Sequence, residues 1–196
     1  SICAVIAGIK TVFSEQRQEI TMTFREYLKE HILIMDGAMG TYYDSLKSDK
    51  NQIAEEANLA DPVFIKSIHK EYLNSGAKLL RTNTFAVNRF MAISKGLETK
   101  EEQDHYMNQS IKAAYEIAKA AIAECGKEAW IAADIGPISE TLFYEEKYQE
   151  REEYQILIDA FLECGADIFN VSEISICVLY CLLAVIASYS SATLTI

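Results

Sequence analysis

The sequence predicts an α/β fold built on a parallel sheet, because short apolar segments alternate with longer segments that have the apolar spacing of helices. Two stretches, EYLNSGAKLL at 71–80 and AFLECGADIF at 160–169, share one pattern: a helix end, a glycine, an alanine, a charge and an apolar strand. Four strand–helix units of this kind make the first half of a (β/α)₈ TIM barrel, which takes roughly 250 residues in all. A small doubly wound sheet is the alternative, but no G-x-G-x-x-G motif follows a strand here.

The first elements are expected between residues 32 and 82. The apolar run at 32–35 is typical of a short strand buried on both faces. Asp61 and Pro62 provide a side-chain cap and a first-turn proline, so a helix begins there. Gly76 ends that helix, and the next strand covers 78–82.

The same order then repeats. Thr99 and Glu102 have the spacing of a capping box, which predicts the start of a long helix. Gly126 ends this helix, and a third strand follows at 129–133. The last unit consists of a helix over 150–164, closed by Gly165, and a strand over 167–171.

The composition excludes one class of partner. The chain has 196 residues, 50% of them hydrophobic, which is enough for one domain with a core. Its 18 Lys+Arg against 29 Asp+Glu give a formal net charge of −11, which argues against nucleic acid because phosphate binding needs a basic surface. Five cysteines without regular spacing do not indicate disulfides, so we expect a reducing, cytoplasmic location.

The two ends of the chain differ from its middle. We expect residues 1–21 to be an N-terminal extension, because Met22 opens an amphipathic segment. Residues 22–173 are expected to be the domain, and 174–196 form an atypical hydrophobic tail without a charged residue. The apolar centre of the tail, 176–187, is shorter than the ~20 residues that a membrane span needs, so no membrane partner is expected.

Functional groups are expected where the strands end, because parallel α/β folds bind ligands at the carboxyl ends of their strands. Asp36 follows the first expected strand and Glu173 follows the last, and two carboxylates could hold a ligand ammonium. Backbone N–H groups around Gly37 and Gly40 could hold a carboxylate, since glycines let a ligand approach the main chain. Together these contacts suit an α-amino acid.

No catalytic nucleophile is evident at these strand ends, which contain neither histidine nor cysteine. The three histidines, His31, His69 and His105, lie on or beside expected helices without a partner at metal spacing. We therefore expect surface or capping positions for them.

Four motifs carry a resemblance to a known family. DGAMGT at 36–41, IHKEYLNSGAKLLRTNTFAVN at 68–88, DIGP at 134–137 and the GAD-strand-Glu pattern at 165–173 resemble the homocysteine S-methyltransferase family. DGAMGTYY with RTNTFAVNRF is most similar to the homocysteine domain of methionine synthase, or to the bacterial fusions with a methylenetetrahydrofolate reductase. The resemblance covers about residues 22–170.

The resemblance implies a barrel in which zinc turns the thiol of homocysteine into a thiolate, which takes a methyl group to form methionine. The methyl donor would be methyl-folate or methylcobalamin, with betaine and S-methylmethionine left open. Asp36 and a glutamate after the fourth strand would hold the substrate amine. The substrate-binding set is then Asp36, Gly37, Ala38, Thr82, Asn83, Thr84 and Glu173.

The chain departs from this family in two ways. The family takes its zinc-binding cysteines from the second half of the barrel, and those positions are matched by none of Cys3, Cys125, Cys164, Cys177 and Cys181. The family's glutamate falls at Ser172 by position, one residue before Glu173. We therefore interpret the chain as an incomplete, inactive form of the enzyme. The alternative is a non-catalytic half-barrel that binds an amino acid or a partner chain, with an exposed face that favours homo-oligomers or a tail that anchors it.

Overall fold

The chain forms two compact units, Ser1–Leu33 and Ile34–Ile196. The computed structural model describes residues 22–47, 52–144, 148–171 and 193–195. The expected extension, 1–21, and most of the expected tail lie outside the described residues.

The first unit contains one described helix, α2 (Phe24–Glu30). A capping box fixes its start: the backbone N–H of Glu26 donates to Thr23 Oγ1, and the backbone N–H of Thr23 donates to the Glu26 carboxylate at 2.9 Å. His31 is exposed at the C-cap of α2, as the sequence predicts.

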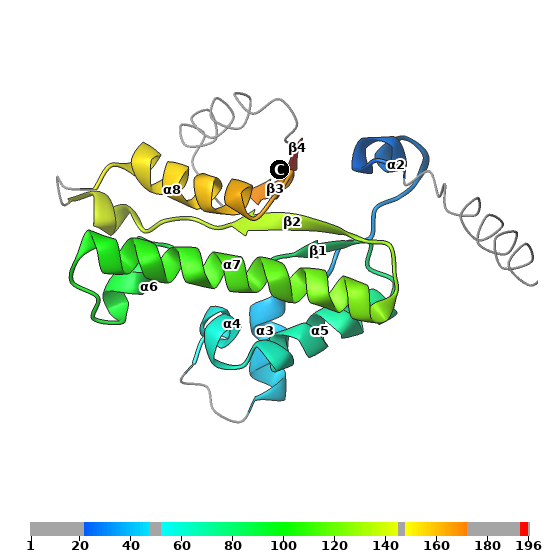
Figure 1. Cartoon of the computed structure of the whole chain (residues 1–196), viewed down its shortest axis with the longest axis horizontal. Coiled ribbons are helices and arrows are strands. Elements are labelled where there is room, and N and C mark those ends of the chain that lie inside the picture. Colours follow the sequence, from blue (N-terminus) through cyan, green and yellow to red (C-terminus); the bar gives the residue numbers. More distant parts are fainter. Residues whose placement is uncertain (1–21, 48–51, 145–147, 172–192, 196) are drawn as a thin grey trace, which may run out of the picture. The chain divides into compact units, whose positions relative to one another are not determined.

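The second unit is built on a parallel sheet in which four strands pair in chain order (Figure 1). They are β1 (Leu79–Arg81), β2 (Trp130–Ile135), β3 (Ile168–Val171) and β4 (Thr193–Thr195). The predicted parallel arrangement is therefore confirmed, and the strands expected at 78–82, 129–133 and 167–171 are present. The second of these runs two residues further than expected and includes Asp134.

The segment at 32–35, expected to be the first strand, is reduced to a single parallel bridge between Met35 and Leu79. The backbone N–H groups of Lys78 and Leu79 donate to the carbonyl oxygen of Ile34, at 2.8 and 3.3 Å. The expectation of burial on both faces is wrong, because Ile34 is 55% exposed and Met35 is 37% exposed. Within the described residues this segment pairs with β1 alone, so it lies at an edge of the sheet and has no neighbour to cover its other side.

Helices fill the segments between the strands. Their described members are α3 (Met39–Leu46), η1 (Ala54–Glu56), α4 (Ala57–Ala60), α5 (Pro62–Asn74), α6 (Arg89–Ser94), α7 (Lys100–Cys125), η2 (Glu140–Tyr144) and α8 (Glu150–Glu163). The predicted helix starts are confirmed: the backbone N–H of Phe64 donates to Asp61 Oδ1 at 3.2 Å, and Thr99 forms both halves of a capping box with Glu102. None of the described helices combines the length and the apolar character that a membrane span requires.

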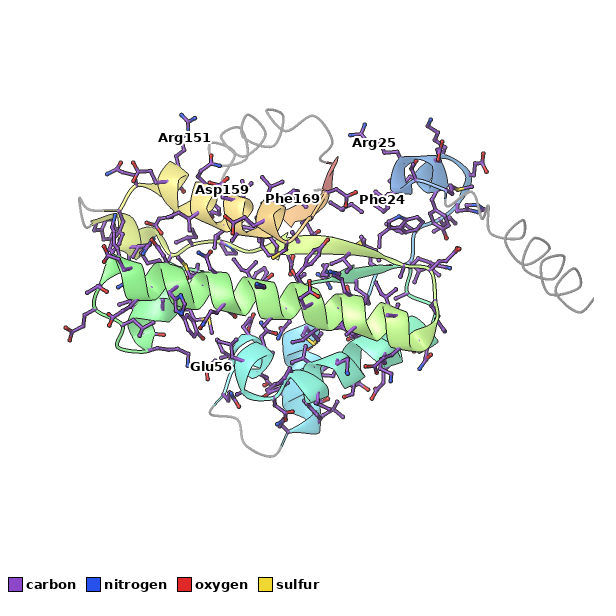
Figure 2. The ribbon with its side chains drawn as sticks, viewed as in Figure 1. Phe24, Arg25, Glu56, Arg151, Asp159 and Phe169 are labelled. Atoms are coloured by element: carbon purple, nitrogen blue, oxygen red, sulfur yellow. The ribbon has the colours of Figure 1, made fainter. Side chains whose placement is uncertain are left out.

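The long helix α7 organises the packing of this unit. It runs along the sheet between α5 and α8, and it also contacts α6 (Figure 1). The largest apolar cluster joins α6, α7 and α8 to β2 and β3. In that cluster Phe169 of β3, which is labelled in Figure 2, packs edge-on against Phe161 of α8, with ring centroids 6.4 Å apart. The helices thus hold the strands in place, so that the strand ends are fixed relative to one another.

A buried ion-pair network also ties the helices together. Arg89 of α6, only 1% exposed, donates from Nε to the carboxylate of Glu153 on α8 at 2.5 Å. Its other nitrogens reach Gln103 and Asp104 at the start of α7, at 3.1 and 2.6 Å. A buried guanidinium is stable only when its N–H groups are paired in this way, so the network fixes how α6 and α8 meet α7.

His69 is buried on α5, with a relative exposure of 0%. Neither of its ring nitrogens has a hydrogen-bond partner. Burial lowers the pKa of His69 to about 4, so the ring is neutral at pH 7. The expectation of a surface or capping position is therefore wrong for His69, although it is confirmed for His105, which is exposed on α7.

Candidate functional site

A cavity of about 490 Å³ opens where the first segment, β1 and β2 reach their carboxyl ends. It is lined by residues 36–41, Glu55, 81–85 and Asp134. The cavity brings together six of the seven residues predicted from the sequence: Asp36, Gly37, Ala38, Thr82, Asn83 and Thr84. The seventh, Glu173, lies outside the described residues.

Asp36 is held by Arg81, which comes from the neighbouring strand. The backbone N–H of Arg81 donates to Asp36 Oδ2 at 2.9 Å, and Arg81 Nε donates to Oδ1 at 3.0 Å. Arg81 Nη2 also donates to the carbonyl oxygen of Gly37 at 2.9 Å. Burial raises the pKa of Asp36 above its ordinary value, and the contacts with Arg81 oppose this rise without cancelling it. The result is a fixed carboxylate beside a half-buried guanidinium.

The loop after Asp36 is clamped by a second side chain. The hydroxyl of Tyr72, on α5, donates to the carbonyl oxygen of Ala38 at 3.1 Å. The ring of Tyr72 lies so close to Gly37 that a Cβ there would come within 2.8 Å of its hydroxyl oxygen. Only glycine therefore fits at this position without displacing the ring.

The helix that follows this loop begins at the cavity. Its N-cap is Ala38, which supplies no side-chain hydrogen bond to the first turn. Met39, Gly40 and Thr41 form the start of α3 and line the cavity. The first N–H groups of a helix have no acceptor within the helix, and the helix dipole adds positive character there. This edge of the cavity is therefore suited to an anion such as a carboxylate.

Thr82 and Thr84 join the ends of β1 and β2. Their hydroxyl oxygens lie 2.7 Å apart. Thr84 Oγ1 donates to the carbonyl oxygen of Asp134 at 2.6 Å, and the backbone N–H of Asp134 donates to Thr82 Oγ1 at 2.9 Å. The two threonines thus fix the main chain on both sides of the Asp134 side chain.

Asn83 uses its side-chain amide to hold the wall of the cavity. Its Nδ2 donates to the carbonyl oxygen of Ala54 at 2.7 Å and to Asn58 Oδ1 at 2.9 Å. Asn58 returns a hydrogen bond to the carbonyl oxygen of Asn83 at 2.7 Å. This side chain therefore connects β1 to η1 and α4, and both of its donor hydrogens are already in use.

Two acidic residues of the cavity were not among the predicted site residues. Asp134 is 6% exposed and its Oδ1 accepts from Asn170 Nδ2 at 2.5 Å. Burial raises the pKa of Asp134 to about 6. Burial also raises the pKa of Glu55, whose Oε1 accepts from the backbone N–H of Ala86 at 3.1 Å. The sequence signal for Asp134 is its place at a strand end in DIGP, whereas Glu55 has no such signal.

Gly136 allows the ends of β1 and β2 to come together. A Cβ at Gly136 would lie 2.3 Å from the carbonyl oxygen of Phe85. A backbone oxygen cannot move aside as a side chain can, so this close approach requires glycine. This close approach brings the DIGP motif, which contains Gly136, against the TNTF motif, which contains Phe85.

The described residues do not form a zinc site. No cluster of three or more His, Cys, Asp or Glu at metal-binding distance occurs among them. The described cysteines, Cys125 and Cys164, lie at the ends of α7 and α8, just before β2 and β3 begin. They therefore lie at the amino ends of the strands, opposite the cavity. Cys3, Cys177 and Cys181 lie outside the described residues.

The chain belongs to the homocysteine S-methyltransferase family, whose model matches residues 33–190. This confirms the family that the sequence motifs predict, and the family is one of methyltransferases.

The fold is similar to that of solved homocysteine methyltransferases. The metallated form of the homocysteine methyltransferase MmuM from Escherichia coli matches with a TM-score of 0.68 and 20% identity, covering 87% of this chain and 64% of that one. The oxidized form gives the same TM-score and identity with 63% of its length covered, and the apo form gives a TM-score of 0.62 with 59% covered. The chain thus spans about three fifths of the length of these structures. The likeness confirms the predicted fold, a partial α/β barrel.

Proposed function

We propose that the cavity at the carboxyl ends of the first strands binds homocysteine, and that the chain takes part in transfer of a methyl group to the homocysteine thiol to form methionine. The observation that carries this proposal is the pairing of a fixed carboxylate, Asp36, with the open start of α3 in one cavity. These two features match the two charged groups of an α-amino acid. Membership of the family supports homocysteine as the particular amino acid.

The two charged groups of the substrate would bind to different walls of the cavity. The ammonium would bind to the Asp36 carboxylate, whose orientation Arg81 fixes through Nε and the backbone N–H. The carboxylate would bind to the N–H groups at the start of α3. Thr82 and Thr84 would form the wall between them, since their hydroxyl groups join the ends of β1 and β2.

The role of Glu173 stays a prediction, as does the expectation that residues 22–173 form the domain.

Zinc, when bound in this family, supplies the thiolate character that the reaction needs. The described part of the chain offers no ligand set for it, so these residues provide substrate binding rather than thiolate formation. The methyl donor, the cytoplasmic location and a homo-oligomer also stay predictions.

The test combines substrate binding with turnover. We expect isothermal titration calorimetry to show binding of L-homocysteine to the chain. Asp36→Asn should weaken this binding, whereas Asp167→Asn, the same change at an exposed position before β3, should not. Methionine formation is then measured with added zinc and each of four donors: methyl-folate, methylcobalamin, betaine and S-methylmethionine.

The outcomes separate the proposal from its alternative. Binding with turnover supports the methyltransferase, and binding without turnover supports the non-catalytic half-barrel that binds an amino acid. The absence of homocysteine binding would contradict the proposal and would favour the other form of the alternative, a half-barrel that binds a partner chain.

A further inference from the structure

We infer that Asp134, at the end of β2, is a second carboxylate that binds the substrate ammonium and so makes the cavity specific for an α-amino acid. This inference rests on the proposed function, because it assigns a residue to the same cavity. The motifs used to predict the site gave the second carboxylate as Glu173, whereas the described cavity contains Asp134.

The Asp134 side chain lines the cavity in a fixed orientation with one oxygen unused. Its main chain is held by Thr82 and Thr84, and its Oδ1 accepts from Asn170. Within the described part of the chain, no protein group donates to Oδ2. The residue is 6% exposed, and Oδ2 is not among the described side-chain atoms that are both buried and without a partner, so it is open to a ligand donor from the cavity.

The two other acids of the cavity, Asp36 and Glu55, also accept hydrogen bonds from the protein. Asp36 accepts from Arg81 through both carboxylate oxygens, and Arg81 is further committed to the carbonyl oxygen of Gly37. Glu55 accepts from the backbone N–H of Ala86. Asp134 and Glu55 each accept through one carboxylate oxygen only. Of these two acids, Asp134 is the one on which the charge of Asp36 acts, so it is the acid placed to share a cation with Asp36. A primary ammonium has three N–H donors, so it can bind Asp134 and Asp36 together.

The protonation of Asp134 should make homocysteine binding depend on pH. Burial raises its pKa to about 6, Asp36 and Glu55 act in the same direction, and Asn170 and Arg81 oppose the rise. Only the charged carboxylate attracts an ammonium strongly. Homocysteine affinity should therefore be full above pH 7 and should fall as the pH drops through about 6.

The test compares two ligands that differ only in the amino group. L-Homocysteine and 4-mercaptobutanoate share the thiol and the carboxylate, and calorimetry gives the ratio of their affinities. Loss of one charge-assisted hydrogen bond lowers affinity about 10-fold or more. For Asp134→Asn we expect the affinity for homocysteine to fall by that factor and the affinity for 4-mercaptobutanoate to stay nearly constant. Asn keeps the shape of the side chain, and its oxygen can still accept from Asn170.

The matched control is Asp167→Asn, which removes an exposed carboxylate near the amino end of β3. Its affinity ratio and its pH profile should equal those of the unmodified chain. Circular dichroism and thermal unfolding check that each variant is folded.

Two results would overturn the inference while leaving the proposed function intact: an unchanged affinity ratio in Asp134→Asn, or an equal loss for both ligands. If the unmodified chain binds no homocysteine, the proposed function fails and the inference fails with it.

Discussion

Replacement of His69 by methionine should remove a large part of the acid sensitivity of the fold. His69 is fully buried and both of its ring nitrogens lack a partner, so the folded chain binds a proton there only near pH 4. The unfolded chain binds that proton at the ordinary pKa of 6.5. Between these two values protonation favours the unfolded state, so the free energy of unfolding falls as the pH decreases.

The size of the effect follows from the two pKa values. Each pKa unit between folded and unfolded states corresponds to ~1.4 kcal/mol, so the difference between 6.5 and about 4 amounts to ~3 kcal/mol. This contribution of His69 to the free energy of unfolding is fully present above pH 6.5 and is lost as the pH falls towards 4. Asp134 acts in the opposite sense, because its raised pKa favours the folded state as the pH falls. Only the difference between variant and unmodified chain therefore isolates His69.

The assay is urea unfolding of the unmodified chain and His69→Met between pH 4.5 and 7.5. Methionine is close to histidine in size and adapts to an irregular space, and no hydrogen bond is lost. At pH 7.5 the variant should be as stable as the unmodified chain or more stable, and its advantage should grow by ~2.5 kcal/mol by pH 4.5. His105→Met, at an exposed position, should leave the pH dependence unchanged. A difference between His69→Met and the unmodified chain that does not vary with pH would refute the reasoning.

Two further substitutions test the packing around the site. Glu153→Ala leaves the buried Arg89 without its partner on α8. The free energy of unfolding at pH 7, measured by urea unfolding, should therefore fall by ~3 kcal/mol. A loss below ~1 kcal/mol would show that this ion pair is not essential for stability. Gly136→Ala places a Cβ against the carbonyl oxygen of Phe85, so we expect ~1–3 kcal/mol lower stability and weaker homocysteine binding. Gly40→Ala has open space around its Cβ and is the matched control for stability; equal losses of stability from the two alanines would contradict this explanation.

Local chemistry predicts most of the elements of this fold. The caps at Asp61 and Thr99 depend on residues three positions apart, so they can be recognised in the sequence without knowing the fold. The parallel sheet follows from the alternation of strands and helices. The exposure of the segment at 32–35 could not be predicted in this way, because it depends on which strands lie on each side of that segment.

The cavity, like the fold, can be predicted from the sequence only in part. The glycines and acids at strand ends predict where it lies, because parallel strands end at a common edge. The contact between Arg81 and Asp36 depends on the register of two segments 45 residues apart, which one sequence does not reveal. His69 lies on an apolar helix face, where a lone histidine carries no sequence signal of its burial.

The most direct test of the central claim is a backbone amide NMR titration of the chain with L-homocysteine. We predict that the largest shift changes occur at residues 36–41 and 81–85, which line the cavity. The absence of saturable changes, or changes centred on the opposite edge near Cys125 and Cys164, would contradict the claim that this cavity binds homocysteine.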